Sequence, residues 1–128
     1  MEQFKNHSIA VVVPCYKVEK QIQKVVAEIP DYVASIILVN DASPDNTGEI
    51  IDQLAKENSK ITVVHHPKNQ GVGGAMITGF QEAVQQNMEV TIKIDGDGQM
   101  DVAFFDKILN AIFEKKYDFA KGNRFFDR

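Results

Sequence analysis

Short runs rich in β-branched residues alternate along this chain with longer segments in which apolar residues recur at helical spacing. The runs cover residues 9–13, 35–39, 61–64 and 90–94, and residues 117–120 form a fifth predicted strand. Continuous apolar runs such as 9–13 have the character of strands buried on both faces. In the intervening segments, an apolar residue every three to four positions is typical of an amphipathic helix. Ile22, Val25, Val26 and Ile29 are one example, and we expect their helix to end at Pro30.

The order of these segments predicts the fold class. Strict alternation of strand and helix with short connections indicates an α/β domain with a mostly parallel, Rossmann-like sheet and helices on both faces. We expect the second helix to start with Ser43 as its N-cap and Pro44 in its first turn. We expect the third helix to follow a glycine-rich loop over residues 69–74. Its inward face is predicted to consist of Met76, Phe80, Ala83 and Val84.

Polar residues collect where the predicted strands end. In a parallel sheet the carboxyl ends of the strands share one edge, and open α/β sheets bind their ligands there. The residues that follow the first, second and fourth strands at this edge are Pro14, Cys15, Tyr16 and Glu19, then Asp41, then Asp95 and Asp97. This convergence is stronger evidence for a binding site than any one of these residues alone.

The segment Asp95-Gly96-Asp97 places two carboxylates directly after the fourth strand. Carboxylates this close repel each other unless a cation, a proton or hydrogen-bond donors compensate them. Two aspartates suit Mg²⁺ or Mn²⁺ when the phosphates of a ligand supply the remaining oxygens. The pattern therefore favours a site for a divalent metal and phosphate, and a polar turn after a strand is the alternative interpretation.

Asp41 and the glycine-rich loop each have two interpretations. Asp41 is expected either to accept hydrogen bonds from a nucleotide base or to complete a turn and cap a helix. The loop over 69–74 does not match the dinucleotide fingerprint, because Met76 stands in place of the third glycine and the loop follows the third strand. It is expected either to present backbone N–H groups to an anion or to form a purely structural turn.

The remaining candidates are single residues with equally open roles. Tyr16 either stacks on a base or packs at the edge of the sheet. Glu19 is a second candidate base acceptor, and a helix-start glutamate that favours the helix dipole is the alternative. Arg124 either meets a phosphate or sugar or is a solvated arginine.

The two adjacent histidines and the single cysteine are not predicted to be catalytic. His65 and His66 point apart on an extended chain, so we interpret them as structural or peripheral rather than as a shared metal site. Cys15 has no accompanying His-Asp pattern, so we predict no nucleophile. As the only cysteine it forms no internal disulfide, which suits a reducing compartment and a cytoplasmic location.

Composition narrows the possible partners. A chain of 128 residues with 44% hydrophobic residues is expected to form one soluble domain with a real core. The net charge of −4 argues against a nucleic-acid partner, which needs a basic surface. The apolar run at residues 9–13 is too short for a membrane span or a signal segment.

Five motifs, in this order, resemble family 2 glycosyltransferases with a GT-A fold, and most closely the branch that transfers sugars to dolichol or polyprenyl phosphate. The motifs occupy residues 11–19, 39–47, 69–75, 95–99 and 122–125. Each one alone is weak, whereas five in the correct order are specific. A departure is Asn40, where many relatives carry the first aspartate of a pair, which leaves Asp41 alone in the base pocket.

The resemblance implies a nucleotide-sugar donor, either a UDP- or a GDP-sugar, together with Mn²⁺ or Mg²⁺. It implies an acceptor such as a polyprenyl phosphate or a glycan. Asp97 matches the metal ligand of the family's D-x-D motif, and Gly96 lets the backbone pass close to the donor. The donor-binding positions carried over from the family are Pro14, Tyr16, Glu19, Val39, Asp41, Asp95, Gly96, Asp97 and Arg124.

The resemblance covers residues 1–128 but matches only the donor-binding half of the family domain. We therefore expect a longer parent protein whose general base for an inverting transfer lies beyond Arg128, and whose membrane association depends on other segments. Two alternatives stay open. One is a nucleotidyltransferase, although the glycine-rich signature of that class is absent near the N-terminus. The other is a non-catalytic nucleotide-binding α/β module.

Overall fold

The computed structural model describes residues 7–96, 102–114 and 124–127 of the chain. Strands and helices alternate along the described residues in the order β1 (Ile9–Cys15), α1 (Ile22–Ala27), β2 (Ser35–Asn40), α2 (Thr47–Glu57), β3 (Ile61–His65), α3 (Gly71–Gln85), β4 (Val90–Lys93), α4 (Val102–Glu114) and β5 (Arg124–Asp127). These strands form one sheet in the order β3-β2-β1-β4-β5, and every neighbouring pair is parallel. The predicted parallel α/β architecture is confirmed.

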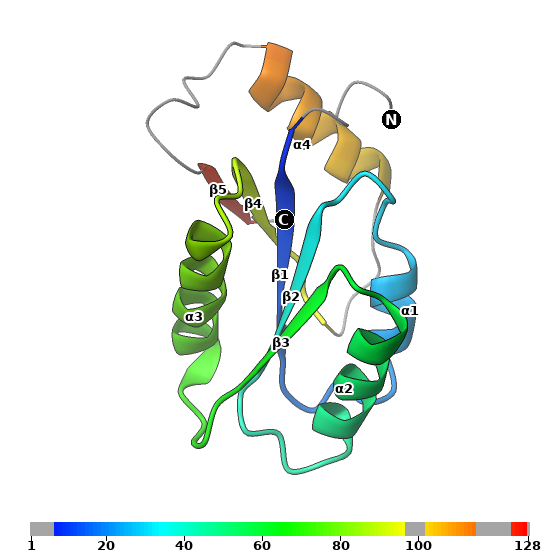
Figure 1. Cartoon of the computed structure of the whole chain (residues 1–128), viewed down its shortest axis with the longest axis vertical. Helices are drawn as coiled ribbons and strands as arrows, with labels where there is room; N and C mark the ends of the chain where they lie inside the picture. The colour runs from blue at the N-terminus through cyan, green and yellow to red at the C-terminus, as the bar shows by residue number, and fades with distance from the viewer. Residues whose placement is uncertain (1–6, 97–101, 115–123, 128) are drawn as a thin grey trace.

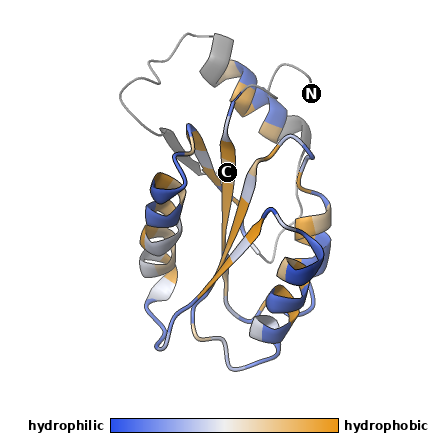
Figure 2. Ribbon diagram, in the orientation of Figure 1, coloured by the Kyte–Doolittle hydropathy of each residue, from blue (hydrophilic) through white to orange (hydrophobic). Residues whose placement is uncertain are grey.

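Helices cover both faces of the sheet, as Figure 1 shows with α3 on the left and α1 and α2 on the right. The alternation of side chains along a strand explains how β1 serves both layers. Ile9, Val11 and Val13 pack into the cluster that includes α1 and α2, whereas Ala10 and Val12 pack toward α3. The central strands are largely apolar and the helices carry both apolar and polar residues (Figure 2).

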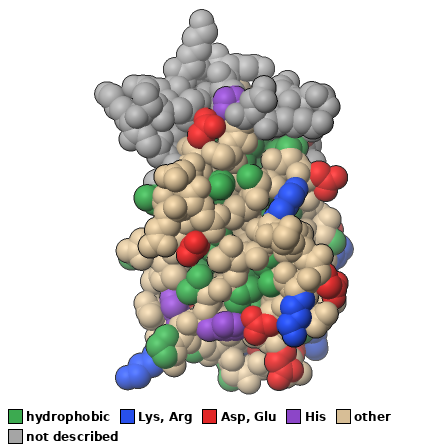
Figure 3. All heavy atoms as spheres, in the orientation of Figure 1, with side chains coloured by type: hydrophobic (Ala, Val, Ile, Leu, Met, Phe, Trp, Pro, Cys, Tyr) green, Lys and Arg blue, Asp and Glu red, His purple; other side chains and the backbone are tan. Residues whose placement is uncertain are grey.

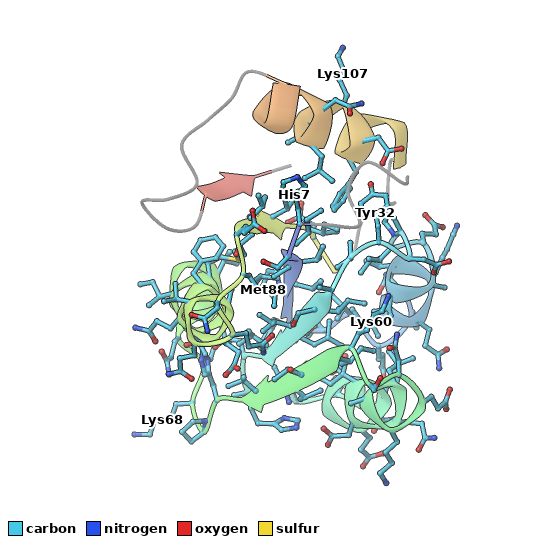
Figure 4. All side chains as sticks on the ribbon, turned by 45° about the horizontal axis from the view of Figure 1, so that its top comes forward. His7, Tyr32, Lys60, Lys68, Met88 and Lys107 are labelled. Atoms are coloured by element: carbon cyan, nitrogen blue, oxygen red, sulfur yellow. The ribbon has the colours of Figure 1, made fainter. Side chains whose placement is uncertain are left out.

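Helix α4 packs against the same side of the core as α1. Phe105 and Leu109 are fully buried members of that cluster. The ring of Phe105 lies 6.1 Å from the ring of Tyr32, centroid to centroid, and the Tyr32 hydroxyl donates a hydrogen bond to the Asp106 carboxylate. Figure 4 shows Tyr32 beside α4. Within the described ranges, no helix has both the length and the apolar character needed to cross a membrane.

Strand β1 is the point at which the direction of sheet growth reverses. The chain adds β2 and β3 on one side of β1, then crosses over through α3 and adds β4 and β5 on the other side. The connection through α1 lies on one face of the sheet, and the crossover through α3 lies on the other face. The carboxyl ends of the strands near such a reversal point are the usual ligand site of open α/β folds.

Two helices begin at positions other than those predicted. Helix α2 begins at Thr47 rather than directly after Ser43, because Ser43 and Asp45 form a hydrogen-bonded turn instead of a helical one. The Asp45 carboxylate accepts a hydrogen bond from the Thr47 backbone N–H at 3.1 Å, and so it binds the first turn of α2 from outside. Helix α3 begins at Gly71, inside the predicted loop.

Two other predictions differ from the structure. Val84 of α3 faces solvent with 53% of its surface exposed, and the helix instead packs through Ala75, Met76, Gly79 and Ala83. The described fifth strand is Arg124–Asp127, so Arg124 lies in a strand and not in a polar turn. The predicted strand over residues 117–120 lies outside the described residues.

Gly79 allows α3 to lie close to β1. A Cβ at this position would overlap the Cγ1 atom of Val12, whereas a Cβ at Gly73 of the same helix would meet no atom within 4 Å. The small residue at position 79 is therefore a packing requirement, because the core has no space for an added methyl group.

We expect Gly79→Ala to lower the free energy of unfolding by about 1–3 kcal/mol through overpacking, which outweighs its gain in helix propensity. Gly73→Ala is the matched control, and it should raise stability by up to about 1 kcal/mol because only propensity changes. Chemical denaturation measures both. Equal stability of the two variants would contradict this account, and Val12→Ala should relieve part of the defect in Gly79→Ala.

Candidate functional site

A pocket of about 270 Å³ opens at the carboxyl ends of β1, β2 and β4, beside the first turn of α3. It lies at the reversal point of the sheet. Its lining residues are Pro14, Cys15, Tyr16, Val18, Asp41, Val72, Ala75, Lys93, Asp95 and Gly96. The structure therefore brings Pro14, Tyr16, Asp41, Asp95 and Gly96 together in one pocket, as expected from their positions at strand ends.

Asp41 is a buried carboxylate held by three hydrogen-bond donors. The residue is 4% exposed. Its Oδ1 atom lies 2.7 Å from the backbone nitrogen of Gln70 and 2.9 Å from Nδ1 of His66, and its Oδ2 atom lies 2.9 Å from the backbone nitrogen of Gly71. A carboxylate offers about four acceptor positions. One position on Oδ2 is therefore left for a ligand.

The environment of Asp41 favours its ionised form. Burial alone would raise the pKa of this carboxyl, but the hydrogen bonds from His66, Gln70 and Gly71 outweigh burial and hold the pKa below its ordinary value. The residue thus caps α3 from a distance and also faces the pocket. The capping role predicted for Asp41 from the sequence therefore matches its bonds to α3. The predicted contact of Asp41 with a nucleotide base stays a prediction.

The glycine-rich segment is organised around Asp41. Gly71 has a φ of +81°, a backbone conformation that side chains disfavour, and its N–H points at the carboxylate. The Asn69 side chain adds two bonds, because its Nδ2 donates to the Asp41 carbonyl and its Oδ1 accepts from the Gly71 N–H. The N–H groups of Gln70 and Gly71 bind a carboxylate of the protein itself, which supports the structural interpretation of this segment.

The end of β4 contributes one cation and one exposed carboxylate. Lys93 Nζ lies 3.6 Å from Oδ1 of Asp95, and the side chains are 23% and 63% exposed. Gly96 is buried, and a Cβ there would lie 3.1 Å from the carbonyl oxygen of Pro14. Gly96 thus lets this segment pass close to the end of β1. Asp97, the predicted metal ligand, lies outside the described residues.

The end of β1 supplies an aromatic wall. Tyr16 is 43% exposed, and the Lys17 ammonium lies 5.5 Å from the centroid of its ring. Cys15 is fully buried and donates to the Val13 carbonyl, and burial raises the pKa of its thiol to about 12. The thiol is therefore protonated at neutral pH, the form in which it is a poor nucleophile.

The turns that leave β1 and β2 bind each other. The N–H of Lys17 donates to Oγ of Ser43 at 2.8 Å, and the N–H of Val18 donates to Oγ1 of Thr47 at 3.1 Å. Glu19 takes part as an acceptor from the N–H of Asn46 at 3.1 Å. These bonds fix the rim of the pocket. Glu19 thus makes a structural contact with this rim and is not one of the residues that line the pocket.

Two other predicted donor-binding residues are not among the described lining residues of the pocket, and the structure excludes only Val39 from it. Val39 has no exposed surface and packs in the cluster on the α3 side of the sheet. Arg124 lies in β5, where only the backbone is described. Their roles toward a ligand stay predictions.

Sequence reasoning missed two polar residues of this region. His66 was interpreted as structural or peripheral without a link to the site, and it is 8% exposed and bonds directly to Asp41. Lys93 is the one cation that lines the pocket within the described part of the chain. A lysine near the end of an otherwise apolar strand was the available signal for Lys93. The pattern held no comparable signal for His66, because its contacts are 12 and 25 residues away.

The described residues hold no cluster of three or more His, Cys, Asp or Glu side chains that could bind a metal. The pocket does offer the exposed carboxylate of Asp95, a hard oxygen ligand of the kind that Mg²⁺ and Mn²⁺ prefer. A divalent ion fits this donor chemistry when the phosphates of a ligand complete its coordination.

Comparison with known proteins gives the class to which this site belongs. The sequence model of Glycosyl transferase family 2 matches residues 10–128. The chain therefore belongs to glycosyl transferase family 2, and the resemblance drawn from its motifs is confirmed.

Relatives with assigned names point to one branch of this family. The chain is 31% identical to UDP-N-acetylglucosamine–dolichyl-phosphate N-acetylglucosaminyltransferase of Methanococcus voltae, over 91% of this chain and 51% of that protein. It is 28% identical to undecaprenyl-phosphate mannosyltransferase of Micrococcus luteus, over 91% of this chain and 48% of that protein. The chain thus spans about half the length of these relatives.

Solved structures confirm the GT-A type of fold. The mannosyltransferase PcManGT of Pyrobaculum calidifontis, in complex with GDP-Man and Mn²⁺, superposes with a TM-score of 0.69 at 22% identity, over 84% of this chain and 32% of that chain. S. aureus TarS 1–349 in complex with UDP superposes with a TM-score of 0.68 at 21% identity, with the same coverage.

The ionised Asp41 should make stability depend on acid pH. Its folded-state pKa lies below the ordinary 3.8, so its contribution is present above about pH 4 and is lost as pH falls through the folded-state pKa. We expect Asp41→Asn to cost about 1–3 kcal/mol at pH 7, and this deficit should shrink below pH 4. Urea denaturation from pH 7 to pH 3 measures it. A constant deficit would contradict the assignment, and the exposed Asp31→Asn serves as control.

Proposed function

We propose that the pocket binds the nucleoside diphosphate part of a UDP- or GDP-sugar, and that the protein transfers the sugar to a polyprenyl phosphate or a glycan. The observation that carries this proposal is the meeting of Pro14, Tyr16, Asp41 and Asp95 in one pocket at the reversal point of the sheet. The family assignment favours this activity over a nucleotidyltransferase. The names of the relatives support a polyprenyl-phosphate acceptor.

The chemistry of the lining residues suits the parts of such a donor. The half-exposed ring of Tyr16 offers a flat apolar surface for a base or a ribose. Asp41 has one acceptor position left for an N–H or O–H group of the donor. Lys93 supplies a positive charge at the end of β4, where a diphosphate next to Asp95 would need one.

The proposal includes a divalent cation, Mn²⁺ or Mg²⁺, held by Asp97 with Asp95 beside it. When bound at the diphosphate, such an ion offsets the negative charge that develops on the leaving group. The exposed carboxylate of Asp95 supports this assignment, since Lys93 is its single ionic contact within the described residues.

The transfer is proposed to invert the anomeric centre, with attack by an acceptor oxygen opposite the departing diphosphate. Deprotonation of the acceptor needs a general base. Asp41 is unsuited to this role, because three donors already bind it and hold its pKa low. The base is therefore proposed to be a residue other than Asp41. Because the chain matches about half of each relative, we propose that the base lies in the part of a longer parent protein that corresponds to the unmatched half.

The location proposed for the protein is the cytoplasm, with the parent attached to the cytoplasmic face of a membrane through other segments. The free, buried Cys15 is compatible with a reducing compartment. Nucleic acid is not a proposed partner, because a net charge of −4 is unfavourable for binding phosphates. Acidic and basic side chains are interspersed on the face shown in Figure 3.

Isothermal titration calorimetry of the chain with UDP and GDP, with and without Mn²⁺, tests the donor and the metal together. We expect one nucleotide to bind, and Mn²⁺ to strengthen its binding at least about tenfold. Asp97→Ala should abolish the effect of the metal. The control is Asp31→Ala, which removes an exposed carboxylate at the opposite edge of the sheet. Absence of binding by both nucleotides, or binding that ignores both Mn²⁺ and Asp97→Ala, would refute the proposal.

Removal of the Lys93 charge should weaken nucleotide binding without loss of fold. We expect Lys93→Met to lower the affinity for the diphosphate about tenfold and to reduce the dependence of binding on salt, because one charged contact is lost. Lys60→Met is the matched control, since Lys60 binds the Asp31 carbonyl at the far edge of the sheet (Figure 4). An equal effect of the two substitutions would show that Lys93 acts only through overall charge.

A further inference from the structure

His66 joins two segments that form the pocket. It directly follows β3, and its side chain is 5% exposed. Its Nδ1 atom lies 2.9 Å from Oδ1 of Asp41, at the end of β2, and its Nε2 atom lies 2.8 Å from Oγ1 of Thr78, in α3. The imidazole thus bridges the carboxylate and the helix whose first turn forms one wall of the pocket.

The partners of His66 determine its tautomer. Asp41 is ionised at neutral pH, because its pKa lies below the ordinary value. An ionised carboxylate only accepts hydrogen bonds, so Nδ1 of His66 carries a proton. Nε2 pairs with the Thr78 hydroxyl, so both nitrogen atoms of the imidazole have a partner.

We propose that His66 is a positioning residue of the nucleotide pocket, which holds the Asp41 carboxylate against the first N–H groups of α3. The carboxylate in turn fixes Gln70 and Gly71, and the lining residues Val72 and Ala75 follow directly in the same helix. Without the His66 bond, the N–H groups of Gln70 and Gly71 alone hold the Asp41 carboxylate, and the wall formed by α3 is fixed less firmly relative to the end of β2.

The geometry of Asp41 also determines which of its acceptor positions faces a ligand. His66 and Gln70 both bond to Oδ1, so the open position lies on Oδ2. His66 therefore selects the orientation in which Asp41 meets the donor. The orientation of Asp41 toward a donor rests on the proposed function. The bonds by which His66 links Asp41 to α3 are present without any ligand.

The adjacent histidine offers an internal control. His65 bonds to Asn40 through Nδ1 and to Asp52 through Nε2, both at 2.9 Å, but its side chain is 44% exposed and does not line the pocket. The two residues share their side-chain chemistry and their place at the end of β3. They differ in whether they contact Asp41.

The test compares His66→Asn, His66→Gln and His65→Gln. An asparagine amide can take roughly the place of Nδ1 and keep the donor to Asp41, whereas the longer glutamine amide reaches toward Thr78 instead. We expect His66→Gln to bind UDP or GDP about tenfold more weakly in the presence of Mn²⁺, and His66→Asn and His65→Gln to stay within about threefold of the unchanged chain. Melting temperatures are recorded for all three variants.

A second measurement needs no ligand. In ¹⁵N-edited NMR spectra, the amide protons of Gln70 and Gly71 report their bonds to Asp41. We expect these two signals to shift and exchange faster in His66→Gln, and to keep their positions in His66→Asn and His65→Gln. This readout separates positioning from general stability, because a merely structural histidine would affect amides throughout the core.

Equal nucleotide affinity for His66→Gln and His65→Gln, or unchanged Gln70 and Gly71 signals in His66→Gln, would overturn the proposal. If His66→Gln does not fold, His66→Asn decides, because the proposal requires this variant to fold and to keep both signals. If the unchanged chain binds neither nucleotide, the proposed function fails, and the NMR comparison still tests the role of His66.

Discussion

The site depends on the burial of one charge, the carboxylate of Asp41 at the end of β2. A buried ionised group is costly unless donors surround it, and here the donors come from the connection between β3 and α3. Because His66, Gln70 and Gly71 lie 25 to 30 residues further along the chain, satisfying one carboxylate fixes that connection against β2. The crossover helix α3 consequently begins at the edge of the pocket.

The sheet was predictable because its signal is local. Runs such as 9–13 and 35–39 bury both faces of a strand, and only a covered parallel sheet accommodates several of them. The start of α3 was not predictable from the local pattern, because Asp41, on another strand, accepts the Gly71 N–H at its beginning. The start of α2 depends on local side-chain bonds instead, since Asn40 and Asp45 hold a turn that hydrophobic periodicity does not reveal.

The candidate site shows the same division between local and distant information. The position of a residue after a strand was enough to bring Tyr16, Asp41 and Asp95 into one pocket. The pattern did not distinguish a capping role for Asp41 from a ligand-binding role, because the answer depends on which donors reach each oxygen. It also gave neighbouring histidines the same interpretation, although only His66 turns inward to Asp41 while His65 stays at the surface.

The charges around the pocket bear on how an anion can enter it. Among the described lining residues, Asp41 and Asp95 carry negative charge and Lys93 carries the one positive charge. The donors around Asp41 stabilise its charge without removing it, and Lys93 is already paired with Asp95. A nucleoside diphosphate that enters alone would therefore meet a net negative field. A divalent cation would reverse that balance among the described lining residues, which is the electrostatic argument for the proposed metal.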